Sequence, residues 1–364
     1  MTEPDFIPGL ELSRRFYAEA VLPVLDAAFP GLAHSAARIG SGSEVLGLDT
    51  PRSSDHEWGP RLQLFLSPAD VVHHGRPINK LLSERLPKTF HGHPTHFAPN
   101  GEANDIRAMR ITDGPVHHRV DIADVDGWVL GQLGFAFSQG PTTTDWLATP
   151  TQRLAEVTSG AVFHDGLGEL VPLRERLAWY PHDQWLYVLA CQWKRISQEE
   201  AFVGRCGEVG DELGSAVVGA RLVRDLMRLV LLMDRRYPPY GKWLGSAFAR
   251  TAAAPELTPH LTGALAATDW QTREQHLAVA YERIATLHNS LGLTAAVDPT
   301  TRPYFERPFQ VLRAERFTAA LMQAVTDPEI KVLPLSGAVD QITDNTDFLG
   351  DLGRPRNAVR APAE

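Results

Sequence analysis

The sequence has 364 residues, of which 43% are hydrophobic and 22% charged, with a net charge of −9. This length predicts two domains and is enough to bury a sizeable core. The negative charge argues against a general attraction to nucleic acid, although a local basic groove could survive that average, and it favours a small-molecule or protein partner.

The two cysteines, Cys191 and Cys206, form neither a disulfide framework nor a zinc ribbon. The acidic N-terminus lacks the basic and apolar pattern of a signal peptide. No uninterrupted apolar stretch reaches the ~20 residues that a membrane span needs. We therefore expect a cytoplasmic protein without a membrane segment.

The first third of the chain predicts alternating helices and short strands. Residues 10–29 place apolar side chains at helical spacing. Residues 36–39 then read as a short strand that runs into a turn of glycine and serine. A second strand is expected over 62–66, followed by a helix with Ser67 as its N-cap and Pro68 in its first turn.

Residues 87–104 are rich in Pro, His, Gly and Asn and are predicted to be loop. A third extended segment follows at 116–122, where His117, Arg119 and Asp121 alternate with apolar neighbours and share one face. If this strand lies beside the second one, Asp121 faces the same region as the residues before that strand.

Helical patterns dominate from about residue 144 to 326, including one long helix expected over 199–236. The fold class predicted is α+β, with a small mixed sheet followed by an all-helical domain. The predicted divisions are 1–143, 144–349 and a disordered tail over 350–364.

One stretch carries the clearest chemical pattern. Gly40, Ser41 and Ser43 lie in a small-residue turn whose backbone amides and hydroxyls suit a phosphate. Asp55 and Glu57 follow at positions i and i+2, so on an extended backbone they point the same way and can share a divalent cation. Together these residues predict a metal-dependent nucleotide site.

This pattern resembles the polymerase-beta-type nucleotidyltransferase superfamily. The resemblance implies that Asp55, Glu57 and Asp121 hold one or two Mg²⁺ ions, with Asp121 also orienting or deprotonating the acceptor hydroxyl. It further implies that Gly40, Ser41 and Ser43 contact the triphosphate of ATP or another NTP. His56 and the Gly59-Pro60 pair depart from the pattern, and they predict that the two acids lie on a loop.

Two later segments, 198–215 and 235–244, look like the helical half of an uncharacterised bacterial family with a nucleotidyltransferase-like head, a domain of unknown function. This resemblance covers nearly the whole chain, from the Gly-Ser turn to Gln341, and the second half is its more specific part. By analogy with small-molecule adenylyltransferases, Tyr240 and Lys242 could contact the nucleotide. Glu208 or Asp211 could be the acceptor-side base; helix-surface charges are the competing interpretation. The glycines of 198–215 predict a close approach by other side chains, since each interior helix glycine costs ~1 kcal/mol.

Two other clusters have structural interpretations. The histidines of 91–96, with His117 and His118, could bind zinc or substrate, but their spacing fits no compact zinc motif and favours structural histidines in a loop. Residues 304–309, including Arg307, are expected to anchor the C-terminal helices.

The predicted function is Mg²⁺-dependent transfer of a nucleoside monophosphate, AMP from ATP by default, to a hydroxyl or amine of a small molecule. The alternative is a catalytically inactive nucleotide-binding regulator on the same fold. Nucleic acid is not the expected partner, and neither the acceptor nor an oligomeric state follows from the sequence.

Overall fold

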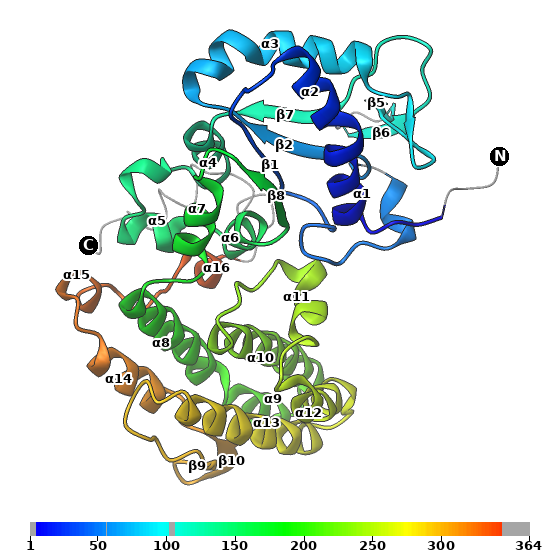
Figure 1. Cartoon of the computed structure of the whole chain (residues 1–364). Coiled ribbons are helices and arrows are strands. Elements are labelled where there is room, and N and C mark those ends of the chain that lie inside the picture. The colour runs from blue at the N-terminus through cyan, green and yellow to red at the C-terminus, as the bar shows by residue number, and fades with distance from the viewer. Residues whose placement is uncertain (1–4, 56, 102–105, 344–364) are drawn as a thin grey trace. The chain divides into compact units, whose positions relative to one another are not determined.

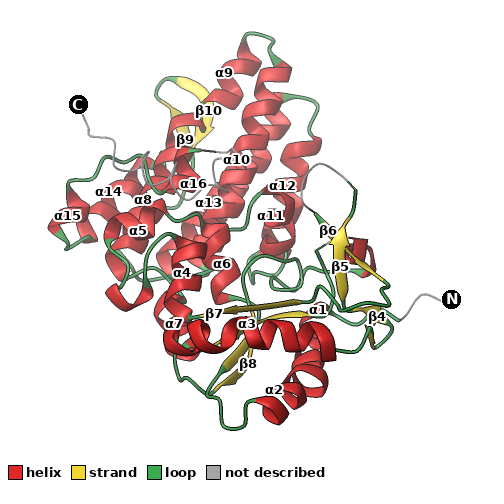
Figure 2. Cartoon of the chain, turned by 90° about the horizontal axis from the view of Figure 1, so that it is seen from above, coloured by secondary structure: helices red, strands yellow, loops and turns green. Residues whose placement is uncertain are grey.

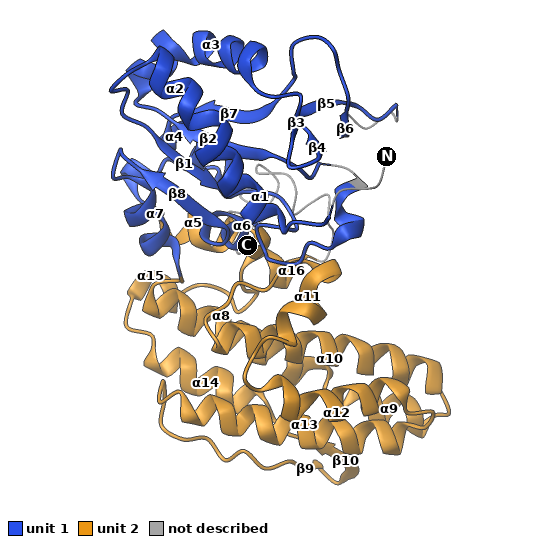
Figure 3. Cartoon of the chain, turned by 45° about the vertical axis from the view of Figure 1, so that its right-hand side comes forward, with its two compact units in different colours: residues 1–141, 153–178 blue, residues 142–152, 179–364 orange. Residues whose placement is uncertain are grey.

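The structure, a computed structural model, describes residues 5–55, 57–101 and 106–343, apart from the side chain of Asp55. It divides into two compact units (Figure 3). The first unit consists of residues 1–141 and 153–178, and the second of residues 142–152 and 179–364. The chain passes from one unit to the other three times, whereas a single division at residue 143 was expected. The predicted tail, 350–364, lies outside the described residues.

The first unit contains a four-stranded mixed sheet, which makes the fold α+β as predicted (Figure 1). In spatial order its strands are β7 (Arg119–Ala123), β2 (Arg61–Phe65), β1 (Ser35–Arg38) and β8 (Ala161–Asp165). β7 runs parallel to β2, and β1 is antiparallel to both of its neighbours. The ends of β1, β2 and β7 lie within three residues of their predicted positions. β7 lies beside β2, as was expected. β8 was not predicted.

One face of this sheet is covered by N-terminal helices, as Figure 2 shows. They are α1 (Gly9–Phe16), a π-helical turn (Tyr17–Val21), α2 (Leu22–Ala28) and α3 (Pro68–Arg85). The oxygen of Ser67 accepts the Asp70 amide at 3.1 Å, which confirms the predicted N-cap.

The core on this face is aliphatic and aromatic. Complete burial of such a side chain stabilises the fold by roughly 1.5–3 kcal/mol. The strands contribute Leu62, Leu64 and Val120, and the helices contribute Leu12, Phe16, Ile78 and Leu82. Because strand residues alternate between faces, Arg61, Gln63, Arg119 and Asp121 point to the opposite side.

That opposite side is partly covered by α4 (Val125–Leu133), whose N-cap Asp124 accepts the Gly127 amide at 2.7 Å. Trp128 of α4 packs edge-to-face on Phe65 of β2, with ring centroids 5.6 Å apart. The prediction of loop over 87–104 was partly wrong, because the region contains the hairpin of β3 (Thr89–Phe90) with β4 (His93–Pro94) and also strand β5 (His96–Pro99). β5 pairs with β6 (Arg107–Arg110), which follows the region. The described part of the unit also includes short helices at Pro51–Asp55, Phe137–Gln139 and Leu170–Leu177 (α7).

The second unit is mainly helical. The helices of its described part are α5 (Thr143–Ala148), the start of α6 (Thr151–Thr158), α8 (His182–Glu199), α9 (Phe202–Glu208), α10 (Glu212–Met233), α11 (Gly241–Phe248), α12 (Ala254–Ala266), α13 (Trp270–Ser290), α14 (Glu315–Ala324), α15 (Pro328–Lys331) and α16 (Val339–Ile342). A hairpin, β9 (Arg302–Tyr304) with β10 (Arg307–Val311), interrupts them. No described helix has the length and apolar character that crossing a membrane requires.

The prediction of one helix over 199–236 was wrong, because the chain breaks between α9 and α10. Gly210 has a φ of +81°, which ends α9, and Asp211 caps the start of α10. The predicted close approach at the glycines is confirmed. A Cβ on Gly207 would lie 2.0 Å from Trp270, and one on Gly204 would lie 2.4 Å from Phe309.

Candidate functional site

The first unit contains a polar cavity of about 250 Å³ on the face of the sheet opposite α1 to α3. Four predicted site residues line it: Gly40, Ser41, Glu57 and Asp121. The other lining residues are Arg38, Ile39, Arg61, Gln63, Arg119, Trp128 and Gln132. Residues from the turn, the loop before β2 and strand β7 therefore line the same cavity, although Gly40 and Asp121 are 81 positions apart in the sequence.

Strand register explains this convergence. Arg61 lies opposite Arg119 across the parallel pair β2 and β7, and Gln63 lies opposite Asp121. Paired residues in adjacent strands point to the same face, so all four side chains are directed to the cavity side. Gln63 also accepts the Ile39 amide at 3.1 Å, which ties the end of β1 to the same face.

The Gly-Ser turn directly follows β1. Gly40 has a φ of +81°, its amide donates to Glu156 at 2.8 Å, and a Cβ there would meet Trp128 at 3.2 Å. No described residue accepts a hydrogen bond from the amides of Ser41 and Gly42. Ser41 lines the cavity and Gly42 does not, so the Ser41 amide is the donor that could meet an anionic oxygen there. Ser43, the other serine predicted here, is not among the residues that line the cavity.

A buried ion-pair cluster that sequence analysis missed supports the turn. Arg38 and Glu44 pair at 2.8 Å with both side chains 2% exposed, and Arg61 reaches the same Glu44 oxygen at 2.7 Å. Burial raises the pKa of Glu44, but Arg38 and then Arg61 outweigh it, so this pKa lies below its ordinary value. Arg38 also donates to the Ser41 carbonyl at 2.5 Å, which connects the Gly-Ser turn to this ion-pair cluster.

Glu57 lies in the loop before β2, as the Gly59-Pro60 pair predicted. Its backbone has a φ of +48°, and its amide and carboxylate Oε1 form reciprocal hydrogen bonds with the backbone of Arg107, both 2.9 Å. The Arg119 guanidinium donates to Oε2, and Arg61 Nη1 lies 3.9 Å from that oxygen. Both oxygens of this predicted metal ligand thus have partners within the protein.

Two of the residues that line the cavity, Glu57 and Asp121, carry carboxylates, the ligand type that a hard divalent cation takes, but both Glu57 oxygens already accept from Arg107 and Arg119. Asp55 ends the short helix Pro51–Asp55, and its side chain, like residue His56, lies outside the described part. Among the described residues, no three His, Cys, Asp or Glu side chains are grouped to hold a metal. The predicted triad remains a prediction.

Four predicted residues belong to the second unit. Tyr240 precedes α11 and its amide donates to Gln152 at 3.1 Å, while the exposed Lys242 lies over the neighbouring Trp243 ring at 4.7 Å. Asp211 accepts the Gly214 amide at 2.7 Å as N-cap of α10, which gives it a structural role. Glu208 lies 3.7 Å from Arg307, and both side chains are about half exposed.

The loop histidines have protein partners. His91 pairs with Glu19 at 3.0 Å, and His96 Nδ1 accepts the His117 amide at 3.0 Å. His118 contacts the Asn79 carbonyl at 3.1 Å, and His93 packs edge-to-face on Trp58. Burial lowers the pKa of His93, His96 and His118. These contacts are consistent with structural histidines.

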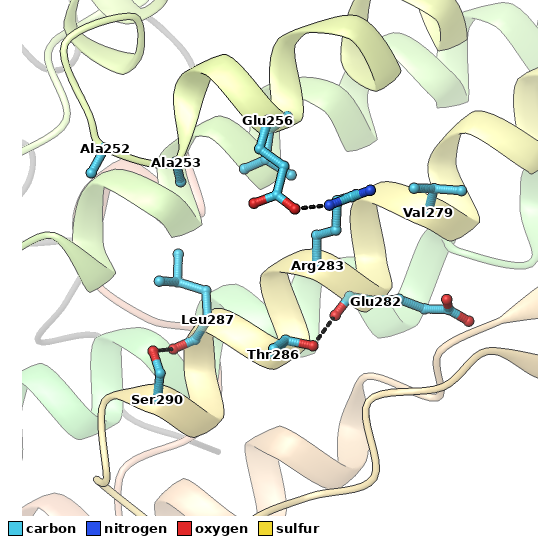
Figure 4. Close-up of a pocket in the computed structure, with 10 residues that line it drawn as sticks. Ala252, Ala253, Glu256, Val279, Glu282, Arg283, Thr286, Leu287 and Ser290 are labelled. Carbon is cyan, nitrogen blue, oxygen red and sulfur yellow. Dashed lines mark hydrogen bonds and ion pairs between the residues drawn. The ribbon is translucent and has the colours of Figure 1, made fainter.

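A second cavity, of about 560 Å³, lies between α12 and α13 of the second unit (Figure 4). Glu256 of α12 forms an ion pair with Arg283 of α13 across it. Leu257 and Leu287 supply part of its apolar wall. None of the residues predicted for the nucleotide site lines this cavity.

Comparisons with known proteins give a family match and a distant structural similarity. Residues 146–244 match the family described as a domain of unknown function, DUF4037. Both later segments, 198–215 and 235–244, lie in this range, which confirms the expected similarity to a domain of unknown function there. The match does not extend to the Gly-Ser turn or past residue 244. A crystal structure of a nucleotidyltransferase-like protein from Exiguobacterium sibiricum 255-15 aligns at 14% identity and a TM-score of 0.33, over 87% of this chain and 89% of that one. Comparison with curated proteins found no match.

Proposed function

We propose that this protein is a nucleotidyltransferase that transfers a nucleoside monophosphate, AMP from ATP by default, to a hydroxyl or amine of a small molecule. One observation carries the proposal. The turn residues Gly40 and Ser41 and two of the three predicted acids, Glu57 and Asp121, line a single polar cavity. Four of the residues chosen from sequence for one reaction therefore line one cavity.

In this proposal each group has a chemical role. The turn residues Gly40, Ser41 and Ser43 and the nearby guanidinium groups hold the phosphates, because charge-assisted bonds to phosphate oxygens are strong. Asp121 is exposed, and its carboxylate takes the proton from the acceptor hydroxyl. Asp55, Glu57 and Asp121 would hold Mg²⁺, which when bound neutralises charge on the attacking and leaving oxygens.

The roles of Tyr240 and Lys242 as nucleotide contacts, and of Glu208 or Asp211 as acceptor-side base, also belong to this proposal. Lys242 is exposed, so its ammonium group is accessible to solvent and to ligands in solution. The capping bond of Asp211 favours Glu208 as the candidate base.

The test is pyrophosphate release from Mg·ATP in the presence of a metabolite extract. We expect Asp121→Asn and Asp55→Ala to lower turnover by about 100-fold or more, since loss of a general base or a metal ligand removes at least that factor. Asp113→Asn is the matched control, because Asp113 is exposed and does not line the cavity. Unchanged turnover in Asp121→Asn and Asp55→Ala would reject the proposed function.

A second candidate function is a nucleotide-binding regulator that no longer catalyses. The engagement of both Glu57 oxygens by Arg119 and Arg107 favours it, because a catalytic metal ligand must be available to metal. Calorimetric binding of Mg·ATP without pyrophosphate release under any extract would support the regulator. Absence of binding would reject both functions.

A further inference from the structure

The ion pair between Arg119 and Glu57 occupies a residue that the proposed function assigns to metal. Glu57 Oε2 accepts from Arg119, and Oε1 accepts from the Arg107 amide at 2.9 Å. A divalent cation entering this cavity alone would therefore have to displace a guanidinium group. Charge-assisted bonds of this kind are about twice as strong as neutral ones.

Arg119 is the arginine of the cavity that is best placed to move. Arg38 and Arg61 are tied to Glu44, which is 2% exposed, whereas the Arg119 and Glu57 side chains are 29% and 33% exposed. The Arg119 Nε atom is buried and has no hydrogen-bond partner among the described residues. Such an unsatisfied donor costs free energy that an incoming acceptor oxygen would recover.

The charges around the cavity also favour two ligands together. Among the described side chains, Arg38, Arg61 and Arg119 carry three positive charges, and Glu44, Glu57 and Asp121 carry three negative ones. A nucleoside polyphosphate bound alone would leave its negative charge uncompensated in this balanced set. A divalent cation bound beside it offsets part of that charge, and this effect is larger in a partly buried site than in water.

We propose that Arg119 is a switch between the two ligands of this site. Without nucleotide it holds the Glu57 carboxylate; when a nucleoside polyphosphate enters, its guanidinium group moves to a phosphate oxygen and leaves Glu57 free for a divalent cation. Cation and polyphosphate then bind cooperatively, and linkage makes the effect reciprocal. This inference rests on the proposed function and assigns Arg119 a positioning role within it.

The experiment uses the full chain and Mn²⁺ as the probe, with free Mn²⁺ followed by electron paramagnetic resonance. Titrations are made with and without α,β-methylene ATP, which cannot release pyrophosphate. Arg119→Gln removes the switch. Arg110→Gln is the control, since Arg110 is exposed, does not line the cavity, and bonds only to its neighbour's carbonyl among the described residues.

We expect Arg119→Gln to bind Mn²⁺ about fivefold more tightly than wild type without nucleotide, since a partly exposed ion pair contributes up to about 1 kcal/mol. The factor by which the ATP analogue tightens Mn²⁺ binding should fall by a similar amount. Arg110→Gln should behave as wild type. If Arg119→Gln does not fold, Arg119→Met carries the same test, because it also removes the charge that pairs with Glu57 while keeping an unbranched side chain.

Two results overturn the switch. If Mn²⁺ affinity and its coupling to the analogue are the same in wild type and Arg119→Gln, while wild type releases pyrophosphate, the switch fails and the proposed function stands. If wild type binds neither Mn²⁺ nor the analogue, both fail.

Discussion

Glu44 and Arg38 form an ion pair of 2.8 Å in which each side chain is only 2% exposed. Arg61 donates to the same Glu44 oxygen, so one buried acid pairs with two guanidinium groups. Arg38 also donates to the Ser41 carbonyl in the Gly-Ser turn. A second acid, Glu11, also pairs with two arginines, Arg14 and Arg15, but its side chain is 34% exposed. The two acids differ mainly in burial.

This contrast gives the first prediction. Glu44→Ala should lower the free energy of unfolding by about 3 kcal/mol or more, because it leaves a buried guanidinium without its counter-charge. Glu11→Ala should cost no more than about 1 kcal/mol, since water screens exposed pairs. Urea unfolding of both variants measures the difference. Equal losses would mean that Glu44 does not hold Arg38 as the structure indicates.

A second prediction concerns the glycines of the second unit. Gly207→Ala should be destabilising, because the added Cβ would lie 2.0 Å from Trp270. Gly245→Ala, within α11, should be stabilising by up to about 1 kcal/mol, since nothing lies within 4 Å of that Cβ and alanine favours the helix. Thermal unfolding should therefore shift in opposite directions. A stabilising Gly207→Ala would contradict the close packing of α9 on Trp270.

The third prediction is a pH dependence. Burial raises the pKa of Glu274 from 4.5 to about 7, against the opposing hydrogen bond from the Gln310 amide. The folded state then binds a proton that the unfolded state has released between these pH values, so stability falls as pH rises through this window. In Glu274→Gln that contribution disappears.

We compare the free energy of unfolding of wild type with that of Glu274→Gln between pH 4.5 and 7. The wild-type value relative to the variant should be highest at pH 4.5 and should fall by up to about 3 kcal/mol as the pH rises to 7. Urea unfolding at several pH values measures it. A difference that stays constant with pH would show that Glu274 titrates normally in the folded protein.

The fourth prediction separates two roles for Asp211. Its carboxylate caps α10, so Asp211→Ala should cost about 1 kcal/mol of stability, whereas Asp211→Asn should retain most of it. Turnover of Asp211→Asn then reports on catalysis alone. Unchanged turnover leaves Asp211 as a helix cap, while a large loss would restore it as a candidate base. Stability equal to wild type in Asp211→Ala would show that the cap contributes nothing.

The strands around the cavity could be predicted because their patterns are local. The alternation that placed Arg119 and Asp121 on one face is a property of seven consecutive residues, and Ser67 signals its helix directly. β8 was not predicted from the sequence because Ala161–Asp165 is a five-residue segment between helices, although Gly160 and Gly166 flank it. The signals for a short strand were present but were weaker than the surrounding helical pattern.

The arginines of the cavity could not be assigned from sequence in the same way. Arg38 ends a strand whose residues are all buried, and only its partner Glu44, six positions later, makes that burial acceptable. The pairing of Glu57 with Arg119 joins residues 62 positions apart, so no local pattern indicates it. Contacts of this kind depend on strand order, which short-range periodicity does not determine.

The place of β8 in the sheet also limits how this chain can be divided for experiments. Residues 153–178 supply β8, the strand that pairs with β1 on the side away from β2. A fragment that stops at residue 143 would leave the backbone donors and acceptors of β1 unpaired along that edge, and open edges promote association with other chains. Expression of the first unit alone therefore requires a fragment that continues to about residue 178.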